Sequence, residues 1–134
     1  MQTVSLELSQ KLYEKGLRIE TEKWWTRSYL ISKKENDPYF ITQRPYHKPD
    51  EYPAPSTDEL LTIVDREAIL EAIHFSEVYV EHYRKFQDIA PALIFFEFIQ
   101  DVNNLGKMCE WLLDNGWVYD EAAKCLIKTG RKND

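Results

Sequence analysis

The stretch from Tyr52 to Leu61 constrains the fold more than any other part of the chain. It reads Tyr-Pro-Ala-Pro-Ser-Thr-Asp-Glu-Leu-Leu. Ser56 and Glu59 have the spacing of a capping box, in which the hydroxyl and the carboxylate each accept a hydrogen bond from a backbone N–H that the first helical turn leaves unsatisfied. Pro55 favours an extended chain before that turn. The stretch therefore predicts a helix that begins after Ser56.

Length and composition predict one folded domain. The chain has 134 residues, of which 43% are hydrophobic, with charged residues spread along it. A chain of this size buries roughly two-thirds of its unfolded surface around one core, and this composition disfavours global disorder. We expect a single domain over residues 1–127 and a flexible tail over residues 128–134.

The first half of the chain predicts a helix followed by a small sheet. Ser5 is a candidate N-cap, Leu8 and Leu12 share a helical stripe, and Gly16 is a C-terminal stop. Aromatic and β-branched residues predict a strand within 22–32, a turn over 33–38 and a short strand over 39–41. Four prolines make residues 45–55 an extended loop, which we interpret as a segment covering the core rather than a functional loop.

The second half of the chain begins with the capped helix, and a further helix is predicted before Asn115-Gly116. Residues 69–73 either extend the capped helix or begin another element, and an alternating pattern predicts a strand over 75–83. The apolar run 92–99 fits a buried strand or the first turns of one long helix reaching Asn115. A broad apolar stripe over 105–113 predicts a helix ending at Asn115-Gly116. Residues 117–119 are expected to be extended, with 125–127 pairing with them or forming a last helical turn.

These elements predict an α+β fold. Two or three helices would pack on a small, mainly antiparallel sheet, with the C-terminal helix and the strand bearing Trp24 and Trp25 in the core. A mostly helical fold is the alternative.

No pattern in the sequence predicts catalytic, metal-binding or cofactor-binding residues. Nucleotide-binding, metalloprotease and hydrolase motifs are absent, and the cysteines form no metal-binding pair. Cys109 and Cys125 are expected to be free thiols. Glu71 and His74 form one ExxH pair, whereas a di-iron bundle needs a second copy, so a surface pair is the favoured interpretation. We therefore expect no cofactor.

Acidic residues are concentrated in the second half of the chain. Residues 1–56 carry nine Lys/Arg against eight Asp/Glu, and residues 57–134 carry eight against fifteen, for a net charge of −6 overall. Such a chain lacks the basic footprint that supplies most nucleic-acid affinity, so direct nucleic-acid binding is not expected. An acidic surface fits a basic protein partner, and mimicry of nucleic acid is a further hypothesis.

The sequence predicts a cytoplasmic protein. No stretch approaches the roughly 20 apolar residues of a membrane helix, and residues 1–10 lack the basic start and apolar run of a signal peptide. No membrane association is expected.

Three stretches resemble small uncharacterised proteins of phage and prophage type. They are Leu6–Trp25, Tyr52–Leu61 and Leu105–Val118, the last reading Leu-Gly-Lys-Met-Cys-Glu-Trp-Leu-Leu-Asp-Asn-Gly-Trp-Val. In those proteins an N-terminal helix and a Trp-bearing strand precede an Ala-Pro-Thr/Ser-x-Asp-Glu-Leu-Leu helix. The resemblance covers under half of the chain and implies an α+β fold without an assigned activity. The long proline loop and the segment after Val118 depart from the pattern.

The leading functional hypothesis is a non-enzymatic accessory protein that binds an unknown protein partner and is itself a monomer or weak homodimer. Aromatic side chains anchor many interfaces, and exposed acids suit a basic partner. The candidate interaction residues are Trp25, Tyr46, Tyr52, Glu77 and Glu81. The alternatives are a small enzyme using clustered glutamates and histidines, and an acidic mimic of nucleic acid.

Overall fold

The computed structural model describes residues 2–27, 39–86 and 88–129, and within them the chain forms six helices and five strands. The helices are α1 (Leu6–Glu14), α2 (Thr57–Ile63), α3 (Arg66–Phe75), α4 (Glu77–Lys85), α5 (Pro91–Phe98) and α6 (Val102–Asp114). The strands are β1 (Lys23–Arg27), β2 (Tyr39–Gln43), β3 (Tyr52–Pro53), β4 (Trp117–Asp120) and β5 (Cys125–Lys128). The α+β class is confirmed, but with more helices than the two or three expected.

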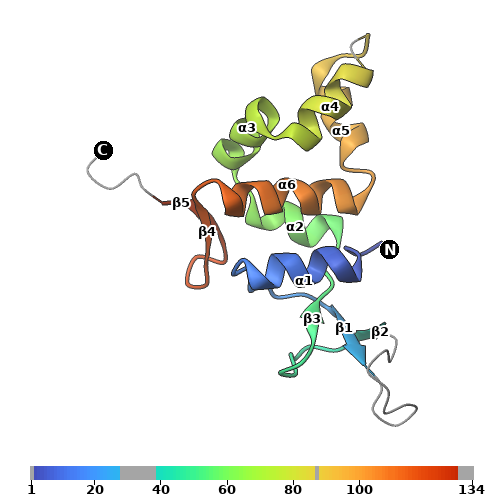
Figure 1. Ribbon diagram of the computed structural model, residues 1–134, viewed down its shortest axis with the longest axis vertical. Coiled ribbons are helices and arrows are strands. Elements are labelled where there is room, and N and C mark those ends of the chain that lie inside the picture. Colours follow the sequence, from blue (N-terminus) through green and yellow to red (C-terminus); the bar gives the residue numbers. More distant parts are fainter. Residues whose placement is uncertain (1, 28–38, 87, 130–134) are drawn as a thin grey trace.

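Helix α6 forms the centre of the molecule, and α1, α2, α3, α4 and β4 all contact it. Figure 1 shows α1, α2 and α6 side by side across the middle, the three-stranded sheet beyond α1, and the α4–α5 pair at the opposite end. The buried face of α6 carries Leu105, Met108, Cys109 and Leu112, each fully buried. The core is therefore built mainly between helices, rather than between helices and one sheet.

The predicted helix caps are confirmed. Ser5 Oγ accepts from the Leu8 N–H at the start of α1, and Gly16 ends that helix at φ +99°. Ser56 and Glu59 form the complete capping box of α2. Asp101 caps α6, which runs to Asp114 before Asn115 and Gly116.

Both sheets are antiparallel and small. In the first, β1 lies between β2 and β3, with Trp25 opposite Ile41 and Tyr52. Helix α1 contacts β3 on this sheet. In the second, β4 and β5 form a hairpin, which was one of the two expected arrangements, with Tyr119 opposite Leu126. Lys128 is the last residue of β5 and pairs with Trp117, although we had expected the tail to begin there.

The strand predicted over residues 75–83 is wrong, because these residues form the end of α3 and most of α4. Tyr79, His82 and Phe86 follow helical spacing and face α5, where Tyr79 and His82 both contact Phe98. Glu77 in the first turn and Lys85 in the last complement the helix dipole. The apparent alternation covered only four residues, which is too short to separate the two periods.

The apolar run 92–99 is helical but does not continue into α6. Pro91 occupies the first turn of α5, which ends with the Ile99 N–H donating to the Phe95 carbonyl, and Asp101 then starts α6. Residues 69–73 likewise belong to a separate helix, α3, capped by Asp65. Helix α4 was thus missed, α5 was expected as a strand or as part of a longer helix, and α3 is the separate element that was one of two alternatives. The turn expected over 33–38 and the later part of the strand predicted over 22–32 lie outside the described residues.

Candidate interaction groove

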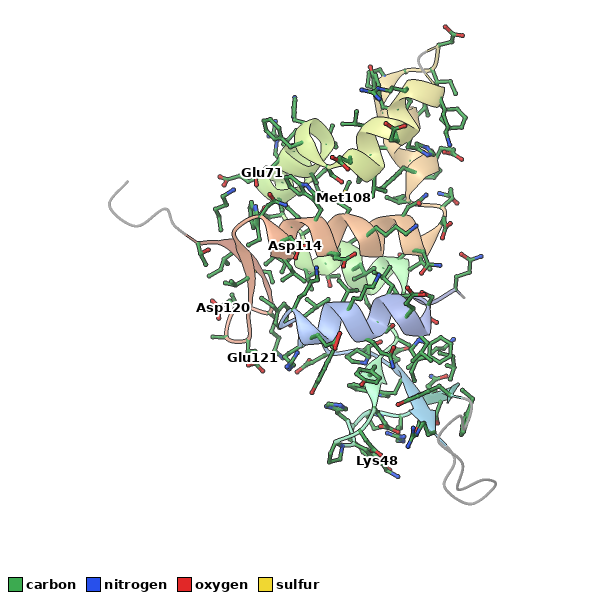
Figure 2. All side chains as sticks on the ribbon, in the orientation of Figure 1. Lys48, Glu71, Met108, Asp114, Asp120 and Glu121 are labelled. Atoms are coloured by element: carbon green, nitrogen blue, oxygen red, sulfur yellow. The ribbon has the colours of Figure 1, made fainter. Side chains whose placement is uncertain are left out.

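A groove of 840 Å³ runs along the outer face of α6, between α1 and the corner that joins α3 to α4. Figure 2 shows Asp114 at the end of α6 nearest the β4–β5 hairpin, facing α1. The lining residues come from all three walls: Ser5, Glu7, Leu8, Lys11, Phe75, Glu77, Val78, Asp101, Asn103, Lys107, Glu110, Trp111 and Asp114.

Helix periodicity explains how α6 serves both the core and the groove. Asn103, Lys107, Glu110, Trp111 and Asp114 recur at intervals of three or four residues, so they share one stripe of the helix. The buried residues of α6 occupy the other side. The groove therefore follows the axis of α6 over about three turns.

The apolar part of the groove is formed by side chains that remain accessible. Phe75 is 69% exposed at the end of α3, whereas Val78 and Trp111 are half-buried. The nearby Ser76 hydroxyl is buried and lacks a hydrogen-bond partner among the described residues. An exposed phenylalanine beside a partly buried tryptophan offers apolar surface that a bound side chain would remove from water.

Carboxylates outnumber cations along the groove. Five acids, Glu7, Glu77, Asp101, Glu110 and Asp114, line it together with two lysines, Lys11 and Lys107. Lys11 Nζ lies 3.5 Å from Glu7 Oε1, and the adjacent Lys15 Nζ lies 3.1 Å from Glu110 Oε2 and 2.7 Å from Asp114 Oδ1. The lining thus carries net negative charge beside its apolar surface.

The residues predicted to form an interaction surface do not converge. Glu77 lines the groove, whereas Glu81 lies one turn further along α4 and pairs with Arg84 at 2.9 Å. Trp25 is half-buried on β1, and its indole N–H donates to the Val4 carbonyl. Tyr46 and Tyr52 lie near the first sheet, where Tyr52 packs edge-on against Tyr13. The five residues therefore form no single surface, because Trp25 and Tyr52 are paired across β1 and β3, whereas Glu77 and Glu81 lie on α4.

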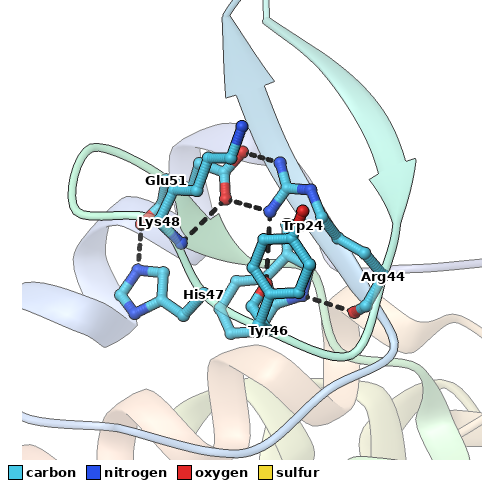
Figure 3. Close-up of polar contacts among 6 residues, drawn as sticks. All are labelled: Trp24, Arg44, Tyr46, His47, Lys48 and Glu51. Atoms are coloured by element: carbon cyan, nitrogen blue, oxygen red, sulfur yellow. Dashed lines mark hydrogen bonds and ion pairs between the residues drawn. The ribbon is translucent and has the colours of Figure 1, made fainter.

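The proline loop is held by a buried ion pair, shown in Figure 3. The two terminal nitrogens of the Arg44 guanidinium, Nη1 and Nη2, donate to Oε1 and Oε2 of Glu51. Glu51 Oε1 also accepts from the Lys48 N–H. His47 stacks on Trp24 with ring centroids 4.7 Å apart. Burial would raise the pKa of Glu51, but hydrogen bonds from Arg44, Thr26 and Lys48 outweigh it and lower the pKa to about 2. These contacts are those of a covering segment packed onto the first sheet.

The Glu71–His74 pair makes no joint site. The Glu71 carboxylate accepts from the Trp117 indole N–H at 2.9 Å and from the Lys128 ammonium at 2.6 Å, while His74 Nδ1 contacts the Leu70 carbonyl. Over the described ranges no group of histidine, cysteine and carboxylate side chains is arranged to hold a metal ion. Glu71 thus connects α3 to the β4–β5 hairpin.

The other titratable candidates are also part of the packing. His82 Nε2 lies 2.5 Å from Glu97 Oε2 between α4 and α5, without the angles of a hydrogen bond. Cys109 and Cys125 are free, as expected, and burial raises the pKa of the Cys109 thiol to about 12. Cys109 is therefore an unreactive core side chain.

A second exposed apolar surface lies on α5, which the sequence did not reveal. Leu93 is 59% exposed and Phe96 is 63% exposed, and the preceding Ile89 is 39% exposed. The spacing of Leu93 and Phe96 places them on one side of the helix, opposite the fully buried Ile94 and Phe98. The continuous apolar run had concealed this division, because every position in it except Glu97 is hydrophobic.

Comparisons of the chain with models of protein families, with curated proteins and with solved structures found no match. The resemblance to phage-type proteins therefore stays a prediction from the sequence. Among the described helices, none is both long enough and apolar enough to cross a membrane.

Proposed function

We propose that this protein is a non-enzymatic binding module that recognises another protein through the groove along α6. The supporting observation is the groove itself, which combines exposed Phe75 with Trp111 and a surplus of carboxylates. Aromatic side chains flanked by polar groups are typical of the centre of protein interfaces. The cytoplasmic location and phage-type origin expected from the sequence belong to the same proposal.

Binding is favoured over catalysis by the composition of the groove. Among the described residues that line it, none is a histidine or cysteine, and Ser5 is the only serine. Ser5 Oγ is engaged as the cap of α1. Nucleophilic catalysis needs a nucleophile next to a base, and the described lining lacks that pairing.

Site-specific photo-crosslinking tests the proposal. A photoreactive amino acid replaces Lys107, which is exposed on the groove stripe of α6, and in a matched variant it replaces Lys48 on the proline loop. Figure 2 shows Lys48 near the three-stranded sheet, away from α6. Both variants are irradiated in host lysate and the adducts are identified by mass spectrometry.

We expect one protein to be crosslinked from position 107 and not from position 48. Adducts from position 48 alone would contradict the groove and favour the proline loop as the interaction surface. Absence of a specific adduct from both positions would overturn the binding proposal.

A further inference from the structure

We infer that the occupant of the groove is an amphipathic helix with basic flanks, belonging to another protein. This inference rests on the proposed function and names the class of partner. Three observations carry it: the helical walls of the groove, its accessible apolar side chains and its net charge.

The walls of the groove favour a helix over an extended peptide. Its floor and sides are side chains of α1, α4 and α6 together with the end of α3, and the backbone groups within these helices are paired with one another. An extended peptide gains affinity by pairing its backbone with a strand edge, whereas a helix satisfies its own backbone hydrogen bonds. A trough between helices therefore suits another helix.

The length of the groove sets the length of the occupant. The lining residues of α6 run from Asn103 to Asp114, which corresponds to on the order of 17 Å of helix. A bound helix of about three turns spans that distance and presents apolar residues at i, i+3 or i+4 and i+7. Those residues would pack against Phe75, Val78 and Trp111.

The charge of the groove favours basic flanks. Glu77 stands on the α4 side, Glu7 on the α1 side, and Glu110 with Asp114 on the last turns of α6. Lys15 neutralises part of the charge of Glu110 and Asp114, so the strongest surplus is at Glu77 and Asp101. Lysine or arginine on either side of an apolar stripe would meet carboxylates on either wall.

A displayed library of three-turn helical peptides tests the inference on the full chain. Each peptide carries apolar residues at i, i+3, i+4 and i+7, and the flanking positions are randomised among acidic, neutral and basic residues. Clones are selected on the wild-type protein, and the affinity of each enriched clone is then measured on the wild type and on Phe75→Ala. Because Phe75 is 69% exposed, this variant is expected to fold, which circular dichroism verifies.

We expect the enriched clones to have basic flanks. Their affinity should fall roughly tenfold on Phe75→Ala, the loss expected of an interface anchor. It should also weaken with added salt and on the double variant Glu77→Gln/Glu110→Gln, while Glu81→Gln, a matched glutamate outside the lining, leaves it unchanged.

Three outcomes would overturn the inference: enriched clones with neutral or acidic flanks, no enrichment at all, or equal binding to Phe75→Ala. If a partner is still crosslinked from position 107, the binding module stands and only its helical, basic occupant is rejected. If that crosslink also fails, the proposed function fails with it.

Discussion

Glu51 combines near-complete burial with a negative charge, since its side chain is 2% exposed. Its partners come from the sheet and from the loop: Arg44 follows β2, Thr26 lies in β1, and the Lys48 N–H belongs to the loop. A buried charge without partners would be strongly unfavourable, so the loop and the sheet become ordered together.

The buried carboxylate makes part of the folding stability dependent on pH. Lowering the pKa of Glu51 from 4.5 to about 2 corresponds to roughly 3 kcal/mol of stability. Because the folded-state pKa is lowered, this contribution is complete above about pH 4.5 and is lost as the pH falls toward 2. Thermal unfolding of wild type and Glu51→Gln between pH 2 and 7 measures it.

We expect Glu51→Gln to be less stable at pH 7, with the difference shrinking as the pH falls through that window. Glu121→Gln is the matched control, because Glu121 is an exposed carboxylate in the β4–β5 turn. A constant difference at every pH would show that the substitution acts through packing and not through charge.

Glu59 has a wider role than its cap spacing predicted. Its Oε1 accepts from the Ser56 N–H and from Thr21 Oγ1, and its Oε2 accepts from the Glu22 N–H. We expect Glu59→Ala to lower the free energy of unfolding by about 2–3 kcal/mol, against about 1 kcal/mol for Ser56→Ala. Urea denaturation compares both with Asp58→Ala, an exposed acid in the same helical turn. Equal losses for Glu59 and Asp58 would contradict the bridging role.

The two faces of α5 are expected to contribute differently to the free energy of unfolding. Phe98 is fully buried and contacts Tyr79 and His82, whereas Phe96 is 63% exposed. We expect Phe98→Ala to cost about 3–5 kcal/mol and Phe96→Ala to stay within about 0.5 kcal/mol. Chemical denaturation of the two variants compares the same substitution on opposite sides of the helix. A large loss for Phe96→Ala would mean that this side is covered.

The sequence was most informative where a local rule selects one structure. The caps at Ser5 and Ser56 and the stop at Gly16 each act within a few residues, and the structure has them as predicted. The strand predicted for the residues of α4 was wrong because a short alternation of apolar and polar residues fits a strand as well as a helix. What decided between them was packing against Phe98, which the order of residues in α4 does not contain.

The candidate groove could not be predicted from local sequence patterns, because it too depends on tertiary packing. It joins Glu7 of α1, Phe75 of α3 and Trp111 of α6, which come together only through tertiary packing. Of the five residues predicted to form an interaction surface, only Glu77 lines the groove. Its exposure could be inferred because a charged side chain usually faces solvent. The lining of a groove requires the positions of all its walls.

At the scale of the whole molecule, Gly106 allows α6 to pack closely against Leu8 of α1. A Cβ at this position would lie 2.7 Å from Leu8 Cδ2 and 3.3 Å from Val4 Cγ2. The Val4 carbonyl also accepts the indole N–H of Trp25, so the segment just before α1 connects α6 to the sheet. We therefore expect the helices and the first sheet to unfold as one unit.

Gly106→Leu tests this cooperativity. Overpacking is expected to cost about 1–3 kcal/mol or more, and hydrogen exchange should accelerate in α1, α6 and β1 alike. Gly16→Ala, which strains a turn at φ +99° with open space around it, serves as a control without overpacking. Retained protection of the β1 amides in Gly106→Leu would show that the sheet is a separate folding unit.

The pairing of α1 with α6 also determines when the chain can fold during its synthesis. The Ser5 N–H donates to Asn103 Oδ1, and Lys15 pairs with Asp114, so the first helix depends on residues made about a hundred positions later. At typical ribosomal rates of about 5–20 residues per second, Leu8 and Leu12 wait roughly 5–20 s for the helix that buries them. During that interval the apolar side chains of α1 lack the helix that buries them, and a nine-residue helix is only marginally stable by itself, so chaperones and proteases have access to this segment until α6 emerges.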